Sequence, residues 1–448
     1  MSDDSAPSQA ASSPAESSHT APTEPTQASI EAPTPGLFTP PEHRPSGAPP
    51  TPVNHHAPAL QQDTVAIRSG RSANGPSLAP VLWATSTFVT PTVEEGRRMA
   101  TSVGAATFYS RYGNPTVNAF EEAIAELEGA EAARAFSSGM GAIAAVVLGL
   151  CSKGDHIVTQ HQLYAGTQML LQSVCPRFGI DVTFVDCADP EAWRAAVVPG
   201  KTMLLLAETP ANPRLDLVDL ALLGAIPGPM KAVDSTFATP LSQRPLDHGI
   251  DLVVHSATKA IGGHNDVTLG VVAGSRELMD WIWGFAVLQG ANASPSDALG
   301  GLRGLRTLGV RLRQQTSTAE WLARVLEGDD RVNEVRHPSL PSHPQHELAN
   351  RQMDLTGGLL TFDLAGGFEA GTRFVESTKI CQLATSLGGP ETLVTHPAST
   401  THVNLLPEEL AAAGISPGTI RMSVGLEATE DIVTDVLNAL EAAAGPVA

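Results

Sequence analysis

The 448-residue chain has few cysteines, an excess of acidic over basic residues and no long apolar run, and each of these features excludes a class of protein. Its four cysteines are too sparse for a disulfide framework and none forms a CxxC pair, which fits a reducing compartment. The formal net charge of −20 repels phosphate backbones, so we expect no nucleic-acid partner. The longest apolar stretch, residues 140–151, is far shorter than the ~20 residues of a membrane helix, so we expect no membrane partner.

The N-terminal sequence does not resemble a secretory signal. Residues 1–4 carry acidic side chains in place of the positive charges of a signal, and no apolar core segment follows them. Together with the sparse cysteines, this pattern predicts a cytoplasmic protein.

Residues 1–60 differ in composition from the rest of the chain. They hold 13 of the 35 prolines, no lysine and one arginine, with many Ser, Thr, Ala and Gln residues. Such a segment cannot bury enough apolar surface to offset the entropy lost on ordering, so we expect it to be disordered. The remainder is longer than the length at which a single core usually splits, which predicts two globular domains.

From residue 82 onward, strand-like and helix-like segments alternate. Helical patterns cover residues 142–150 and 431–444. Short apolar runs of strand length lie at residues 156–159, 182–185, 202–207, 231–233 and 251–254. The alternation predicts an α/β fold with a mainly parallel sheet that is covered by helices on both faces. Ligands of such sheets bind beyond the carboxyl ends of the strands, so the polar residues that follow each run are the candidates for a site.

Only five lysines are present, and Lys259 differs from the other four. It follows the apolar run that ends at Val254, at the carboxyl end of a predicted strand, where a reactive amine belongs. The other four lysines lie in turns, at strand starts or in polar stretches, and are expected to be solvated. Ser256 and Thr258 flank Lys259 with hydroxyl groups that suit a phosphate. Lys259 is therefore a candidate catalytic residue.

A carboxylate ends another predicted strand. Asp234 follows the run 231–233 and precedes Lys259 by 25 residues. Pyridoxal phosphate needs both groups, because a lysine binds its aldehyde as a Schiff base while a carboxylate keeps its ring nitrogen protonated. The pair predicts pyridoxal 5'-phosphate as the cofactor, and a turn or helix-cap role is the alternative for Asp234.

Two further features fit a flat, phosphorylated ring. Gly139 and Met140 open the predicted helix that ends near residue 150, and the free N–H groups of such a helix start suit a phosphate. Tyr164 follows the run 156–159 and is one of only three tyrosines. An aromatic side chain in this place can cover a ring.

These residues belong to motifs that carry a family resemblance. From about residue 61 to residue 443 the sequence resembles the Cys/Met-metabolism enzymes, which have the aspartate-aminotransferase type of pyridoxal-phosphate fold (fold type I). The family includes cystathionine γ-synthase, cystathionine γ-lyase, homoserine sulfhydrylases and methionine γ-lyase. The matching motifs are residues 109–116, 138–141, 208–213, 234–236, 256–259, 386–389, 396–399 and 421–427. The resemblance implies a cofactor-binding large domain over residues 121–310 and a smaller α/β domain over residues 311–448.

The resemblance also implies roles for individual residues. Lys259 would be the Schiff-base lysine that moves protons, Asp234 would pair with the pyridinium nitrogen, and Tyr164, the second candidate catalytic residue, would stack on the ring. Further cofactor contacts would come from Gly139, Met140, Asn212, Ser256 and Thr258. The substrate α-carboxylate would be held by the guanidinium of Arg421, with help from Ser386.

The same resemblance implies an active site that two subunits share. Residues 61–120 would form an N-terminal arm that contacts a neighbouring subunit, and Tyr109 and Arg111 would reach the phosphate bound there. The active unit would then be a homodimer, and the usual assembly a tetramer formed as a dimer of dimers. The charges agree with this arrangement, because a phosphate dianion needs a cation and Ser256 and Thr258 supply none.

Members of this family make or break a C–S bond at the γ-carbon of a homoserine-derived amino acid. Members that handle cystathionine commonly have a glutamate where this chain has Thr385, and methionine γ-lyases typically have a cysteine where it has Gly166. The sequence therefore favours γ-replacement on an O-acyl-homoserine by sulfide or a small thiol. Cystathionine synthesis or cleavage, and methionine γ-elimination to α-ketobutyrate and ammonia, stay open as alternatives.

Three other interpretations are less favoured. An aminotransferase or decarboxylase would share the lysine and the aspartate but would not explain the motifs at 109–116 and 386–389. A binding protein without catalytic activity would usually have lost one of these two residues. His337, His343 and His346 cluster in a Pro-rich segment, but the resembled family has this stretch without a metal, so we expect no metal site.

Overall fold

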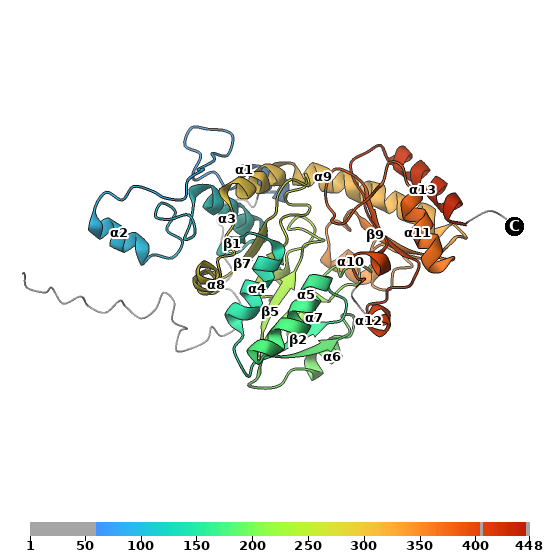
Figure 1. The fold of residues 1–448 in the computed structure, drawn as a ribbon, viewed down its shortest axis with the longest axis horizontal. Coiled ribbons are helices and arrows are strands. Elements are labelled where there is room, and N and C mark those ends of the chain that lie inside the picture. The colour runs from blue at the N-terminus through green and yellow to red at the C-terminus, as the bar shows by residue number, and fades with distance from the viewer. Residues whose placement is uncertain (1–59, 404–405, 445–448) are drawn as a thin grey trace, which may run out of the picture.

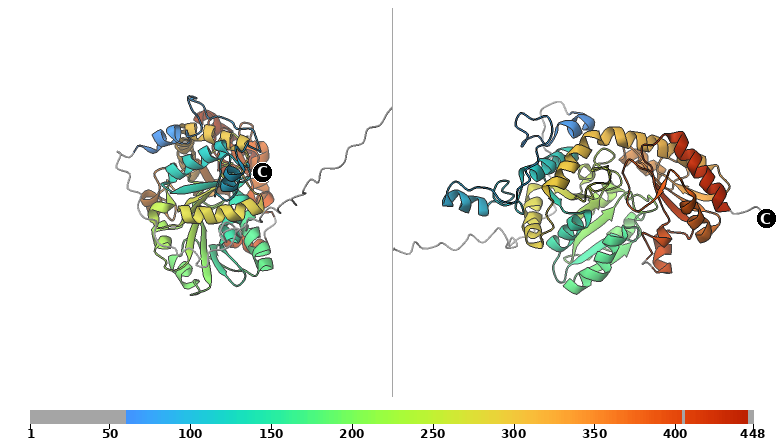
Figure 2. Two further views of the ribbon diagram at one scale, coloured as in Figure 1. Left: turned by 90° about the vertical axis from the view of Figure 1, so that its left-hand side faces the viewer. Right: turned by 45° about the horizontal axis from the view of Figure 1, so that its top comes forward.

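The structure is a computed structural model that describes residues 60–403 and 406–444. It contains a larger and a smaller α/β part, which are joined by the long helix α9 (Pro295–Glu327; Figures 1 and 2). The segment predicted to be disordered, residues 1–60, lies outside the described residues except for Leu60.

The larger part is built on a seven-stranded sheet in the order β1-β7-β6-β5-β4-β2-β3. Its strands are β1 (Ala132–Phe136), β2 (His156–Gln160), β3 (Asp181–Val185), β4 (Thr202–Glu208), β5 (Met230–Asp234), β6 (Leu252–His255) and β7 (Gly270–Gly274). The five strands from β6 to β3 run parallel, while β7 is antiparallel to both of its neighbours. The predicted strands are confirmed, because they agree with β2 to β6 to within one residue at each end.

Helices cover both faces of this sheet, as predicted. One face packs against α4 (Gly139–Leu150) and α8 (Arg276–Gln289), and the other against α1 (Gln62–Arg68), α3 (Pro115–Glu128) and α9. The short helix α5 (Ala165–Met169) packs against α4. Successive strand residues point to opposite faces, so Val254 lies in the first core and Val253 in the second. Burial on both faces explains why the strands are continuous apolar runs in the sequence.

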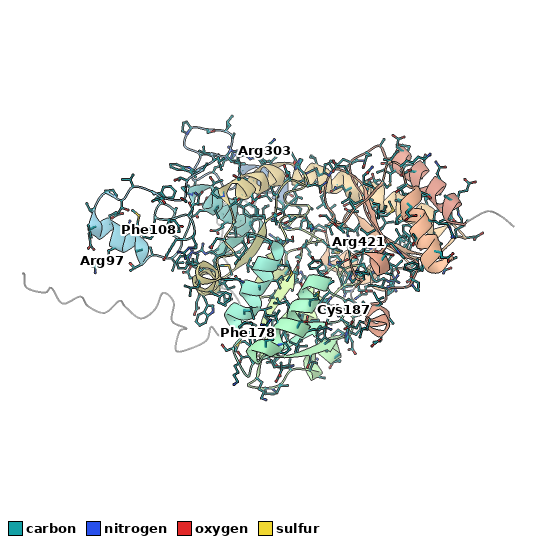
Figure 3. All side chains as sticks on the ribbon, in the orientation of Figure 1. Arg97, Phe108, Phe178, Cys187, Arg303 and Arg421 are labelled. Carbon is teal, nitrogen blue, oxygen red and sulfur yellow. The ribbon has the colours of Figure 1, made fainter. Side chains whose placement is uncertain are left out.

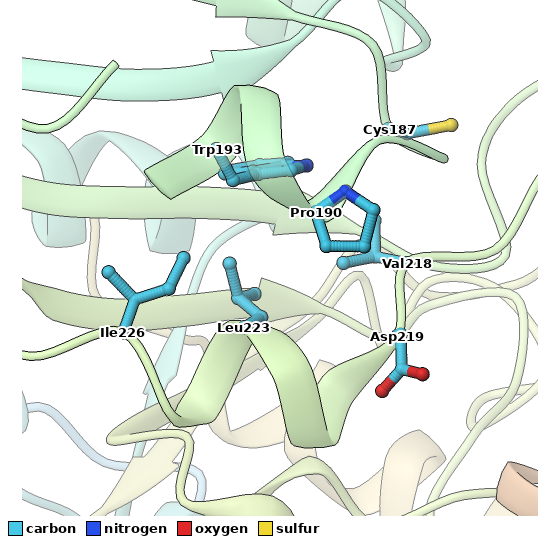
Figure 4. Close-up of a pocket in the computed structure, with 7 residues that line it drawn as sticks. All are labelled: Cys187, Pro190, Trp193, Val218, Asp219, Leu223 and Ile226. Carbon is cyan, nitrogen blue, oxygen red and sulfur yellow. The ribbon is translucent and has the colours of Figure 1, made fainter. Parts of the chain in front are cut away.

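The helices α6 (Pro190–Ala195) and α7 (Leu220–Gly224) close one side of the larger part over a cavity of about 10 Å³. Figure 4 shows Trp193 and Leu223 among the side chains that line this cavity. It has room for about one water molecule, so it is too small for an organic ligand.

The smaller part is built on a five-stranded sheet in the order β10-β11-β12-β9-β8. The strands are β8 (Val332–Arg336), β9 (Leu359–Leu364), β10 (Gln382–Leu383), β11 (Leu393–Thr395) and β12 (Thr419–Ser423). The helices are α10 (His346–Gln352), α11 (Gly367–Ser377), α12 (Pro407–Ala412) and α13 (Thr429–Ala444), which contains the predicted helix 431–444. The expected domain boundary near residue 310 falls within α9, which runs without interruption from one part to the other.

Single-turn elements complete the described chain. They are a π-helix, η1 (Leu170–Val174), and three 3₁₀ turns, η2 (Cys175–Phe178), η3 (Pro245–His248) and η4 (Pro397–Ser399). None of the helices in the described residues has both the length and the apolar character needed to cross a membrane.

The segment around α2 (Val93–Ala100) extends away from the rest of the chain (Figures 1 and 2). Helix α2 buries none of its residues, and Val89 and Val93 are 93% and 92% exposed. Apolar side chains that gather on an extended segment are typical of a surface that another chain covers.

Candidate active site

A cavity of about 570 Å³ lies at the carboxyl ends of the parallel strands, between the two parts of the chain. Ten of the twelve residues that the sequence indicated for the site line it: Gly139, Met140, Tyr164, Asn212, Asp234, Ser256, Thr258, Lys259, Ser386 and Arg421. Tyr109 and Arg111 are not among its lining residues. Figure 3 shows Arg421 where the two parts meet.

Lys259 lies in the loop after β6, and its amine points to the smaller part. Nζ donates a hydrogen bond to Ser386 Oγ at 2.8 Å. Burial, and secondarily the positive charge of Arg421, lowers the pKa of Lys259 to about 8. About a tenth of the amine is therefore neutral at pH 7, far more than for a free lysine, and the neutral amine is the form that a nucleophile or general base requires.

Ser386 accepts hydrogen bonds from both Lys259 and Arg421. Its backbone φ is 91°, a left-handed conformation that a serine rarely adopts and that costs of the order of 1 kcal/mol or more. In this conformation the side chain accepts from Lys259, while the backbone oxygen accepts from Arg421 Nη2 at 3.0 Å. Strain that is retained beside a reactive amine is typical of an active site.

Arg421 is a buried residue of β12, and its other nitrogen reaches the larger part. Nη1 donates to Asn212 Oδ1 at 2.9 Å. Burial lowers the pKa of Arg421 to about 10, against the opposing effect of the Glu208 carboxylate. The guanidinium keeps its charge at neutral pH and suits the carboxylate of an amino acid.

Asp234 ends β5 on the floor of the cavity. Its Oδ1 accepts hydrogen bonds from the Thr236 backbone N–H at 3.0 Å and from the Thr236 hydroxyl at 2.5 Å. Burial raises the pKa of Asp234, while the two bonds from Thr236 oppose the shift. Oδ2 makes no hydrogen bond to the described residues, so it is the oxygen available to a ligand.

Glu208 is a cavity residue to which the sequence analysis assigned no role. It ends β4, and its two oxygens accept from the backbone N–H groups of Tyr164 and Asn212, each at 2.8 Å. Burial and the negative charge of Asp234 raise the pKa of Glu208. Its position directly after the predicted strand 202–207 was a signal that could have identified it.

The start of α4 forms an open cradle at one end of the cavity. The hydroxyl of Ser138 accepts from the Gly141 N–H at 3.0 Å, which leaves the N–H groups of Gly139 and Met140 without intrahelical partners. A Cβ on Gly139 would lie only 2.6 Å from the Cβ of Ser256, so only glycine fits there. The free N–H groups and the positive end of the helix suit a phosphate.

Two hydroxyl groups near this cradle differ in their contacts. Ser256 lines the cavity, and its hydroxyl makes no hydrogen bond to the described residues. The Thr258 hydroxyl donates to Leu269 O at 3.1 Å and accepts from Leu269 N at 2.9 Å. Ser256 is therefore directly available to a phosphate, and Thr258 would have to exchange its bond to Leu269.

Tyr164 lies at the N-terminal end of α5 with 47% of its surface exposed. A Cβ on Gly166 would lie 2.5 Å from Tyr164 Cε1 and 3.1 Å from Met140 Sδ. Glycine at position 166 thus leaves room for the tyrosine ring against Met140.

Tyr109 and Arg111 form a cluster outside the cavity of their own chain. Arg111 Nη1 donates to Val287 O at 3.0 Å, and its guanidinium lies 5.5 Å and 5.3 Å from the ring centroids of Tyr109 and Tyr112. Both Tyr109 and Arg111 are exposed, so they are accessible to a second chain.

The histidine cluster makes hydrogen bonds within the protein. His337 contacts Ser339 Oγ and Gly357 O, and His346 contacts Pro338 O. Within the described ranges, no group of three side chains is placed to hold a metal ion.

The lysine and the carboxylate at the ends of neighbouring strands are the pair that pyridoxal phosphate requires, on an α/β fold. A family model described as "Cys/Met metabolism PLP-dependent enzyme" matches residues 63–441, and the chain belongs to this family. The pyridoxal-phosphate cofactor and the fold type I architecture predicted from the sequence are thereby confirmed.

Two relatives of named activity are similar to this chain over most of its length. The L-methionine gamma-lyase of Fusobacterium nucleatum subsp. polymorphum is 43% identical over 385 residues, or 84% of this chain and 97% of the relative. The O-succinylhomoserine sulfhydrylase of Pseudomonas aeruginosa is 42% identical over 385 residues, or 85% of this chain and 95% of the relative.

A solved structure agrees in fold. The cystathionine gamma synthase from Xanthomonas oryzae pv. oryzae, in complex with cystathionine, matches with a TM-score of 0.81 and 37% identity over 87% of this chain and 100% of that chain. These relatives have three different activities, and all three belong to trans-sulfuration. The comparisons therefore confirm a trans-sulfuration enzyme but do not distinguish among the three reactions.

Proposed function

We propose that this protein catalyses γ-replacement on an O-acyl-homoserine, with sulfide or a small thiol as the nucleophile. In this reaction the Cγ–O bond of the substrate breaks, the acyl group leaves as a carboxylate, and the incoming sulfur forms a bond to Cγ. With sulfide, the product is homocysteine.

The proposal rests on the small number of carboxylates in the cavity wall. Among the described lining residues the only carboxylates are Glu208 and Asp234. Glu208 accepts two backbone N–H groups, and Asp234 is reserved for the cofactor in this proposal. The distal ammonium of cystathionine, or that of cysteine as the donor, finds no further carboxylate on this wall, where Thr385 is neutral. A small nucleophile without an ammonium group fits this wall better.

The described residues fit pyridoxal phosphate at each end. In the proposal, the N–H groups of Gly139 and Met140 hold the phosphate together with the Ser256 hydroxyl, and Thr258 joins them by exchanging its bond to Leu269. Asp234 would hold the ring nitrogen through Oδ2.

Three further side chains complete the proposed cofactor site. Lys259 would bind the aldehyde through Nζ, Tyr164 would cover the ring, and Asn212 would hold the ring hydroxyl. When bound, the cofactor supplies an electron sink that stabilises a carbanion at the substrate Cα.

Lys259 is the group that moves protons in this proposal. With a pKa lowered to about 8, its amine can take the proton from the substrate Cα and later one from Cβ. Arg421 binds the α-carboxylate. Because Lys259 and Arg421 both contact Ser386, a substrate held by Arg421 would be bound close to Nζ.

A steady-state assay of the purified holoenzyme tests the proposal. The substrates are O-acetylhomoserine, O-succinylhomoserine, cystathionine and methionine, each with and without sulfide or cysteine. We expect the highest kcat/KM for an acyl-homoserine with sulfide, with homocysteine as the product. A higher kcat/KM for cystathionine, or for cysteine as the donor, would contradict the proposal.

Methionine γ-elimination is the second candidate. It is favoured by the relative of that activity at 43% identity, and by Ile143 and Met169, which add apolar surface to the cavity wall. Gly166 weighs against it, because a cysteine in this position would collide with the ring of Tyr164 as it lies here. This candidate predicts that methionine without added sulfide gives α-ketobutyrate and ammonia faster than an acyl-homoserine with sulfide gives homocysteine.

We also propose that the active site is shared between chains, in a homodimer that pairs into a tetramer. The only cations on the cavity wall among the described residues are Lys259 and Arg421, both with other roles in this proposal, so the phosphate lacks a cationic partner within one chain. Tyr109 and Arg111 are exposed and lie outside the cavity of their own chain. In the proposed dimer, Arg111 supplies the cation to the phosphate in the neighbouring chain, and Tyr109 contacts the same phosphate.

A cytoplasmic location is also part of the proposal. The four cysteines are free and buried, which fits a reducing compartment.

A further inference from the structure

Helix α9 carries two buried polar side chains that reach the loops on either side of the cavity. Arg311 and Gln315 lie four residues apart and are 4% and 2% exposed. At this spacing they share one face of the helix. Neither is among the residues that line the cavity, so any effect on the chemistry must act through other residues.

Arg311 holds the loop that carries Lys259. Its Nη1 donates to the carbonyl oxygen of Ala260 at 2.8 Å, its Nη2 to Gly304 O at 2.7 Å and its Nε to Thr307 Oγ1 at 3.1 Å. Among the described residues no carboxylate forms an ion pair with it, and burial lowers its pKa to about 10. Burying a cation against carbonyl groups costs free energy, so a role in packing alone would be served better by an apolar side chain.

The helix and this loop are in direct backbone contact. A Cβ on Gly304 of α9 would lie 2.2 Å from Ile261 O. Gly263 has a φ of +70°, and a Cβ on it would lie 1.9 Å from Arg311 Nη1. At Gly304 no side chain separates the two elements, and at Gly263 the guanidinium of Arg311 fills the space between them, so the position of α9 determines where the loop that carries Lys259 lies.

Gln315 holds the loop that carries Ser386. Its Nε2 donates to Gly389 O at 2.8 Å. The two loops also touch each other, since a Cβ on Gly388 would lie 2.5 Å from the backbone nitrogen of the residue after Lys259. Two neighbouring turns of one helix therefore hold both partners of the 2.8 Å hydrogen bond from Lys259 Nζ to Ser386 Oγ.

We propose that Arg311 and Gln315 are positioning residues that set the distance between Lys259 and Ser386. Helix α9 contacts α1 and α3 of the larger part and β8 and β9 of the smaller part, so it can hold the two loops in register. The inference rests on the proposed role of Lys259 as the cofactor-binding lysine.

Four variants of the holoenzyme test the inference. Arg311→Met and Gln315→Leu remove the hydrogen bonds to the loops while keeping similar volumes. Arg313→Met and Gln314→Leu make the same changes at exposed neighbours on the same helix and serve as controls. The readouts are kcat, KM and the pH midpoint of the absorbance of the bound cofactor, together with the melting temperature of the cofactor-free protein.

Arg311→Met and Gln315→Leu should each lower kcat about tenfold or more, because buried backbone acceptors lose their donors and the loops move. Both should also shift the pH midpoint of the cofactor absorbance, while the controls keep kcat within about twofold and leave the midpoint in place. Should Arg311→Met fail to fold, Arg311→Lys must show the same shift, because it keeps the charge but not the forked contact.

A loss of thermal stability with unchanged kcat and an unchanged pH midpoint would show that the two residues only pack, and the inference would be wrong. Failure of the proposed role of Lys259 has a different signature, since the wild-type protein would then carry its cofactor on another lysine. Failure of the proposed reaction would show in the substrate preference of the wild-type protein, which the variants do not decide.

Discussion

The reactive amine of Lys259 is a weaker base in the folded protein than in water. Burial disfavours its charged form and the nearby guanidinium of Arg421 adds to this effect, so its pKa falls from 10.5 to about 8. Among the described residues, its amine donates a hydrogen bond to the hydroxyl of Ser386, which is neutral and restores no charge stabilisation. The neutral amine is the form that bonds to an aldehyde.

The lowered pKa predicts how fast pyridoxal phosphate rebinds to the cofactor-free protein. The neutral fraction of Lys259 increases as the pH rises through its pKa, so the rate should increase with pH, with a midpoint near 8, and level off above it. Absorbance after rapid mixing measures this rate. A midpoint above 10, as for a free lysine, would show that the amine is not desolvated.

Thr385 gives a second prediction at this scale. Thr385→Glu should increase kcat/KM for cystathionine, and for cysteine as the donor, relative to sulfide, by about tenfold, because it adds a carboxylate to a wall that lacks a free one. Thr385→Gln is the matched control, with the same shape and no charge. Equal ratios in the two variants would mean that residue 385 does not face the distal end of the substrate.

Much of the cavity wall could be predicted residue by residue, because parallel strands bring their carboxyl ends to one edge and the polar residues after them come together there. The hydrogen bonds among those residues could not be predicted. Nothing in the sequence indicates that Thr258 is held by Leu269, or that Glu208 is fixed by the N–H groups of Tyr164 and Asn212. Such contacts depend on the exact conformation of the loops, and the one between Tyr164 and Glu208 joins residues that are 44 positions apart.

At the scale of elements, the five parallel strands were predictable, four of them buried and β3 at the partly exposed edge, and β1 and β7 were not. The predicted runs are rich in Val, Ile and Leu, which pack well in a sheet that is covered on both faces. Strand β1 has three alanines in five residues and β7 has a glycine at each end, so neither shows the side-chain signal of a strand. Their pairing with each other and with β6 places them in the sheet.

Because α9 contacts the loop that carries Lys259, replacing two glycines of this helix by alanine should have different effects on stability. Gly304→Ala should destabilise the protein by about 1–3 kcal/mol, because the new methyl group would lie 2.2 Å from a backbone oxygen that cannot easily move. Gly328→Ala at the end of the same helix meets nothing closer than 3.7 Å and should change stability by less than about 0.5 kcal/mol. Urea unfolding of both variants measures the difference, and equal stabilities would show that α9 and the loop can separate without cost.

At the scale of the whole molecule, two residues that the sequence indicated for the site lie away from the cavity. The cavity lies between the two parts, while Tyr109, Arg111 and the apolar residues around α2 lie outside it and are exposed. A second copy of the chain would cover this segment and bring a cation to the phosphate end of the cavity.

Mixing two inactive variants tests this arrangement. Lys259→Ala and Arg111→Ala should each be nearly inactive as homo-oligomers. In a mixed dimer one site carries both defects and the other neither, so dissociation and reassembly together should restore part of the wild-type kcat. Persistent inactivity, with hybrids shown to form by native mass spectrometry, would mean that Arg111 serves the site of its own chain.

The most direct test of the central claim is to locate the bound cofactor. The purified yellow protein is reduced with borohydride, digested and examined by peptide mass spectrometry, with Lys259→Ala treated in parallel. We predict a pyridoxyl adduct on Lys259 in the wild-type protein, and neither the yellow colour nor an adduct in the variant. An adduct on Lys153, Lys201, Lys231 or Lys379 would contradict the account, because the cavity would then not be the cofactor site.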